Sequence, residues 1–129
     1  MTDMTATIRW RKQPLTGSAV WPLDDGRVLD KSSILACLAS AFDFPDYFGG
    51  NWDAAYDLLL DGLDEQTTPH TWCFSIGTQV KVNQEDLVIL IKLLSDACDF
   101  AASRQQLLQV VIQSERQDLA ALQALELAD

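Results

Sequence analysis

The sequence predicts a single α/β domain built on a parallel sheet. Strand-like and helix-like segments alternate along the chain, and such strands pair in parallel because each helix carries the chain back to the same end of the sheet. With 48% hydrophobic and 22% charged residues, the composition is that of a globular protein. A length of 129 residues suits one core and is short for two.

The first predicted element is a strand over residues 5–12. Ile8 and Trp10 fall on one face and Arg9 and Arg11 on the other, as in a half-exposed strand. We expect it at an edge of the sheet. The basic side chains of this segment are most simply interpreted as its solvated surface.

The remaining elements are predicted from apolar spacing, turn residues and N-caps. A short strand stops at Pro22, and helices begin at the N-cap candidates Asp30, Asn51 and Asn83. In chain order we expect a strand at 18–21, a helix at 31–42, a helix from 51 to about 60 or 63, a strand at 70–76, a helix carrying apolar residues from 87 to 98, a strand at 107–112 and a terminal helix within 116–127.

The overall charge narrows the class of partner. Nineteen acidic residues against nine Lys and Arg give a net charge of −10, which disfavours nucleic acid and anionic membranes and favours a basic protein. Cys37, Cys73 and Cys98 lack metal-ligand spacing and lie in apolar runs, so we expect reduced, mostly buried thiols. No signal peptide or membrane span is recognisable. We therefore expect a cytoplasmic protein without cofactors, monomeric when free.

The acidic residues are concentrated in the middle of the chain, which has no Lys or Arg between Lys31 and Lys81. Within the second predicted helix, Asp53, Asp57 and Asp61 recur every four residues and share one face. Like charges at this spacing repel by a few tenths of a kcal/mol per pair. The stripe is consistent with a surface that binds a cationic ligand, although an ordinary solvated helix face remains an alternative.

The loop before this helix supports a binding surface. Gly49 and Gly50 permit tight turns and leave a low surface that a partner can approach closely. We expect Tyr47 to be the exposed aromatic residue of the loop, since its hydroxyl tolerates a polar partner. Asn51 has two interpretations, helix capping and contact with a partner.

At this segment the chain resembles the barstar family of ribonuclease inhibitors. The resemblance implies a barstar-like fold with a three-stranded parallel sheet packed with helices, here with an extra N-terminal edge strand and a C-terminal helix. It implies one domain over residues 1–129, with a core at about 17–113 and extensions at 1–16 and 114–129. The residues that carry it are Pro45, Tyr47, Gly49, Asn51, Trp52, Asp53, Ala54 and Asp57.

The resemblance also implies a function, which is to block the active site of a barnase-like ribonuclease. Carboxylates can replace the phosphate oxygens that converging basic side chains bind in such an enzyme. Asp57 resembles the carboxylate that occupies the phosphate site. The family adds an acidic residue from a later helix, for which Asp96 is the nearest candidate and Asp99 the alternative. The partner-binding residues implied are Tyr47, Gly49, Asn51, Asp53, Ala54, Asp57 and Asp96.

The sequence fits other classes of function less well. An enzyme is disfavoured because the single histidine, His70, begins a predicted strand and is interpreted as structural. A metal site is disfavoured because a helix surface directs its carboxylates apart. The remaining alternative is an acidic interaction module of the same fold that binds a different basic protein or toxin.

Overall fold

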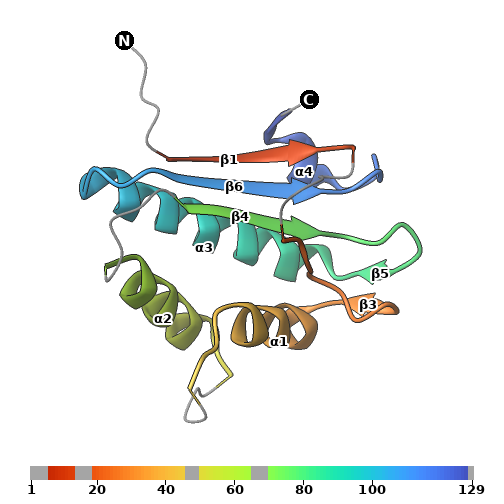
Figure 1. Ribbon diagram of the computed structural model, residues 1–129. Helices are drawn as coiled ribbons and strands as arrows, with labels where there is room; N and C mark the ends of the chain where they lie inside the picture. Colours follow the sequence, from red (N-terminus) through yellow and green to blue (C-terminus); the bar gives the residue numbers. More distant parts are fainter. Residues whose placement is uncertain (1–5, 14–18, 46–49, 65–69, 128–129) are drawn as a thin grey trace.

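The computed structural model describes residues 6–13, 19–45, 50–64 and 70–127. The predicted site residues Tyr47 and Gly49 lie outside these ranges. The described chain forms a layer of helices on a parallel sheet (Figure 1). The α/β class predicted from the sequence is therefore confirmed.

The main sheet has five strands in the order β2-β4-β6-β1-β7, and all of its pairings are parallel. The long central strands are in register, so that His70 pairs with Leu108 and Leu108 with Ala6. A two-stranded sheet, β3-β5, lies beside it. The strands are β1 (Ala6–Arg11), β2 (Trp21–Pro22), β3 (Val28–Leu29), β4 (His70–Ser75), β5 (Lys81–Val82), β6 (Leu108–Gln113) and β7 (Glu126–Leu127).

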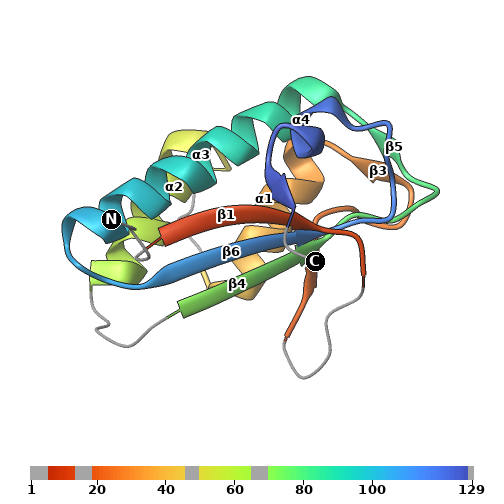
Figure 2. The ribbon, with the colours of Figure 1, turned by 90° about the horizontal axis from the view of Figure 1, so that it is seen from above.

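The helices gather on one face of the main sheet (Figures 1 and 2). On the opposite face, Thr71 and Gln109 are exposed, and no helix of the described residues covers them. The longest helix packs against β1 and β6, while the second contacts the first and the third. The helices are α1 (Lys31–Ala41), α2 (Trp52–Asp64), α3 (Gln84–Ser103) and α4 (Ala120–Gln123).

Polar caps fix the starts of α1 and α3 where the sequence predicts them. The Asp30 carboxylate accepts from the backbone N–H of Ser33, and the Ser33 hydroxyl accepts from the Asp30 N–H, a complete capping box. Asn83 Oδ1 accepts from the Asp86 N–H at 3.1 Å. The Asp86 carboxylate in turn accepts from the Lys31 N–H at 2.8 Å, which ties the first turn of α3 to the start of α1.

The core lies between the sheet and the helices. Trp72 and Phe74 of β4 are buried beneath the helices, and Phe42 contacts the Trp72 ring edge-on with 4.9 Å between ring centroids. Two of the three cysteines, Cys73 and Cys98, are buried and Cys37 is half-buried, and none of the three forms a disulfide, as predicted.

The chain ends differ in detail from the sequence-based prediction. The strand β1 extends the sheet beyond β6 as expected, but β7 pairs with Arg9 and Trp10 and covers part of its outer edge. The predicted terminal helix is limited to the four residues of α4. Pro22, expected to stop the second strand, belongs to it, because β2 is an edge strand on which a missing N–H is tolerated.

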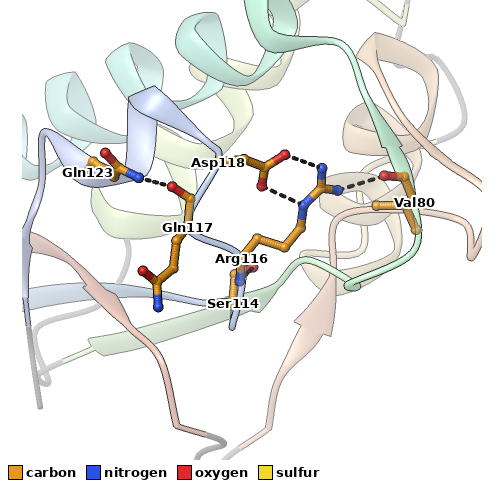
Figure 3. A network of polar contacts seen from close by, with 6 residues as sticks. All are labelled: Val80, Ser114, Arg116, Gln117, Asp118 and Gln123. Carbon is orange, nitrogen blue, oxygen red and sulfur yellow. Dashed lines mark hydrogen bonds and ion pairs between the residues drawn. The ribbon is translucent and has the colours of Figure 1, made fainter.

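A network around Arg116 holds the segment after β6 in place (Figure 3). The Arg116 guanidinium donates to the Val80 carbonyl at 2.6 Å and, through two nitrogens, to the Asp118 carboxylate at 3.1 and 2.9 Å. This contact lowers the pKa of Asp118. In the same segment, the Gln123 amide donates to the Gln117 carbonyl. The hydrogen bond to Val80 thereby attaches the segment after β6 to the residue just before β5.

Candidate partner-binding site

The second helix begins at Trp52, and Asn51 caps it, in agreement with the predicted N-cap. Asn51 Oδ1 accepts from the Ala54 N–H at 2.8 Å, and the Asn51 carbonyl accepts from the Ala55 N–H at 3.1 Å. Gly50, just before it, has a φ of +71°, a conformation that glycine adopts without steric cost. The side-chain oxygen of Asn51 therefore has a capping role, and the residue is exposed.

Two stripes with the same four-residue spacing run along α2. Ala55, Leu59 and Leu63 are fully or almost fully buried. Asp53, Asp57 and Asp61 are exposed, and none of them forms an ion pair with a described residue. The acidic stripe therefore contributes no packing to the core and faces solvent.

A groove of about 240 Å³ separates α2 from α3. It brings Asp53 of α2 together with Asp96 of α3, residues 43 positions apart in the sequence. Trp52 is half-buried beside it and Leu93 is buried. The residues that line the groove are Trp52, Asp53, Tyr56, Ile89, Lys92, Leu93 and Asp96.

Burial and the carboxylates of both helices raise the pKa of the Tyr56 phenol. Its pKa is raised first by burial and then by the negative charges of Asp96, Asp99 and Asp57, in that order. Both candidate acids of α3 are thus close enough to act on α2. Asp96 lines the groove, whereas Asp99 is exposed and also raises the pKa of the Cys98 thiol, after the larger effect of burial.

One cation, Lys92 of α3, lies beside the carboxylates of the groove. Lys92 Nζ lies 3.5 Å from Asp96 Oδ2 and its side chain is 76% exposed. Lys92 lies beyond the interval without Lys or Arg, which ends at Lys81, so the charge pattern of that interval did not indicate a cation in the groove. The groove is consequently less acidic than the outer stripe of Asp57 and Asp61.

The structure brings together five of the seven predicted site residues in a continuous region. Asn51 caps α2, Asp53, Ala54 and Asp57 lie in its first two turns, and Asp96 lines the groove together with Asp53. Ile89, Lys92 and Leu93 also line the groove and were not predicted from the sequence. Their spacing before Asp96, at i, i+3, i+4 and i+7, was the available signal that they share one helix face.

The only histidine lies apart from this surface. His70 is half-buried and lines a cavity of about 290 Å³ with apolar residues of α2 and β4, where its Nε2 atom has no partner among the described residues. Within the described ranges, no group of three His, Cys, Asp or Glu residues is arranged to hold a metal ion. No helix in these ranges has the length and apolar character needed to cross a membrane.

Comparison with known proteins places this geometry in a family. Residues 19–113, nearly three quarters of the chain, match the family model described as Barstar (barnase inhibitor). Comparisons with curated proteins and with solved structures give no match. The matched interval contains β2 to β6 and α1 to α3, and hence the whole acidic surface. The chain therefore belongs to the barstar family of barnase inhibitors, a family of inhibitors rather than enzymes.

Proposed function

We propose that this protein is an intracellular inhibitor, an immunity protein, of a basic ribonuclease of the barnase type. It blocks the nuclease active site with the acidic face of α2 and the loop before it. The observation that carries the proposal is the exposed stripe of Asp53, Asp57 and Asp61 without ion pairs among the described residues, in a chain of this family.

The physical basis is charge complementarity. A ribonuclease holds phosphate with converging cations, and a carboxylate fixed on a helix can accept the same hydrogen bonds. In this proposal Asp57 occupies the phosphate site and Asp53 pairs with a neighbouring cation. Asp96 supplies a further carboxylate from α3, Ala54 provides a small contact surface, and the loop residues Tyr47 and Gly49 complete the interface. Asp61 and Asp64 act at long range.

The test compares two substitutions that remove the same charge. Asp57→Ala removes a carboxylate from the stripe, and Glu115→Ala removes one that follows β6, outside the family-matched interval. Wild type and both variants are titrated against a panel of purified barnase-like ribonucleases. Asp57→Ala should weaken inhibition by more than about 100-fold, because removing one partner of a desolvated ion pair costs about 3 kcal/mol or more.

Folding stability separates binding from structure. The free energy of unfolding should be unchanged or slightly higher in Asp57→Ala, since the change relieves repulsion along the stripe by a few tenths of a kcal/mol. Association should also slow as salt increases, because attraction is screened beyond about 10 Å at 0.1 M ionic strength. Equal inhibition by both variants would refute the assignment of Asp57.

If the wild type inhibits no nuclease of the panel, the inhibitor proposal fails for that class. The protein would then be an acidic interaction module that binds another basic protein or toxin.

A further inference from the structure

Two large apolar side chains of α3 are exposed, and one of them, Ile89, lines the groove that contains Asp53 and Asp96. Val88 is 53% exposed and Ile89 is 40% exposed, at adjacent positions in the second turn of the helix. The core face of α3 is already supplied by Leu87, Leu90 and Leu94, all fully buried. Single exposed apolar residues are common on protein surfaces, so exposure alone does not indicate a site. The significance of this pair comes from the position of Ile89 in the groove, with Val88 as its neighbour in α3.

Ile89 forms part of the groove between α2 and α3. It shares the lining with Trp52, which is half-buried, and with Leu93, which is buried. The carboxylates of Asp53 and Asp96 belong to the same lining. An apolar surface and two acidic groups are thus presented together to the same approaching molecule.

We propose that Val88 and Ile89 form an apolar contact patch within the inhibitor's interface, which binds an apolar or aromatic side chain that the basic partner carries beside its active-site cations. This proposal rests on the proposed function and extends its interface from α2 onto the N-terminal half of α3. Hereafter the two residues are called the α3 patch.

Charge selects a basic protein as the occupant rather than a second copy of the chain. A two-fold symmetric dimer through this face would set the same surface of both copies against each other. Asp53 and Asp96 of one copy would then lie near the same carboxylates of its partner. Lys92 is the only cation in the described groove lining, and it is already paired with Asp96. A basic partner instead gains attraction from the same groups.

The patch and the acidic stripe should affect binding in different ways. Long-range attraction by carboxylates accelerates association and weakens with salt, whereas apolar burial acts at contact and slows dissociation. Loss of apolar surface should therefore raise the dissociation rate and leave both the association rate and its salt dependence unchanged.

The test uses Ile89→Gln and Val88→Gln, which replace a β-branched apolar side chain by an unbranched polar one that is compatible with a helix and leave the net charge unchanged. The matched control is Leu127→Gln in β7, where the side chain is 48% exposed and lies beyond the family-matched interval. Binding kinetics are measured with the barnase-like ribonuclease that wild type inhibits most strongly. We expect each α3 variant to dissociate about tenfold faster, as expected for losing part of one buried aliphatic side chain, and Leu127→Gln to behave as wild type. Thermal melting checks that all three variants remain folded.

Three outcomes would overturn the proposal. The first is dissociation of the α3 variants at the wild-type rate while Asp57→Ala weakens inhibition, which refutes the patch and leaves the proposed function intact. The second is a wild-type dimer in sedimentation equilibrium that Ile89→Gln converts to monomer, which assigns the patch to contact between copies. The third is wild-type protein that inhibits no nuclease, in which case the proposed function fails and the patch proposal fails with it.

Discussion

Replacing Asn51 by alanine removes the N-cap of α2, the helix that carries the acidic stripe. The lost contact is the 2.8 Å hydrogen bond from the Ala54 N–H to Asn51 Oδ1. Loss of such a cap costs about 1 kcal/mol of unfolding free energy, with a range of about 0.5 to 2. In a domain of this size that corresponds to a melting temperature about 4 °C lower. Asn51→Ser, which retains a capping oxygen, should melt close to wild type.

The other asparagine cap provides a matched control. Asn83 Oδ1 caps α3 through the Asp86 N–H at 3.1 Å, so Asn83→Ala should cost a similar free energy of unfolding. Urea denaturation and nuclease inhibition are measured for Asn51→Ala, Asn51→Ser and Asn83→Ala. If Asn51→Ser is stable but inhibits poorly, the asparagine side chain contacts the nuclease in addition to capping α2. If Asn51→Ala is as stable as wild type, the argument from capping is refuted.

Two further predictions concern the thiols and the C-terminal segment. At pH 8, Cys37 and Cys98 in the folded protein should react with a thiol reagent about 100-fold more slowly than in the unfolded chain. The reason is that burial disfavours the thiolate and raises both pKa values to about 11. Reaction should accelerate as pH rises toward that value, and equal rates in both states would contradict the prediction. Arg116→Gln should lower the unfolding free energy by up to about 2 kcal/mol in urea denaturation, because it removes a charged hydrogen bond to the Val80 carbonyl. Inhibition should not change, and a variant as stable as wild type would show that the contact is not stabilising.

Local chemistry made most of the fold predictable from the sequence. Asp30, Asn51 and Asn83 are polar caps that act within three residues of themselves, and the structure confirms all three. The apolar alternation of β4 and the apolar run of β6 are equally local. The four-residue α4 and the two-residue β7 were not predictable, because their limits depend on long-range contacts such as Arg116 with Val80 and β7 with β1. Amphipathic spacing over residues 116–127 is compatible with a longer helix, and tertiary contacts override it.

The candidate site was predictable to the extent that it lies on one helix. The stripe of Asp53, Asp57 and Asp61 follows directly from helical periodicity, and all three are exposed as expected. The groove was not predictable, because it depends on how α3 packs against α2 and helical periodicity does not give that packing. For the same reason Lys92 and Ile89 were missed, although each lies one or two turns from Asp96 on the same face.

The arrangement of α2 explains how one short helix can serve both folding and binding. Its apolar stripe, Ala55, Leu59 and Leu63, is buried and supplies the packing energy, so the acidic stripe is not needed for stability. Repulsion among the carboxylates is small enough, at a few tenths of a kcal/mol per pair, for the buried stripe to offset. The carboxylates can therefore be held close together and without ion pairs in the described structure. A cationic partner gains from that arrangement because no intramolecular ion pair of Asp57 has to be broken before it binds.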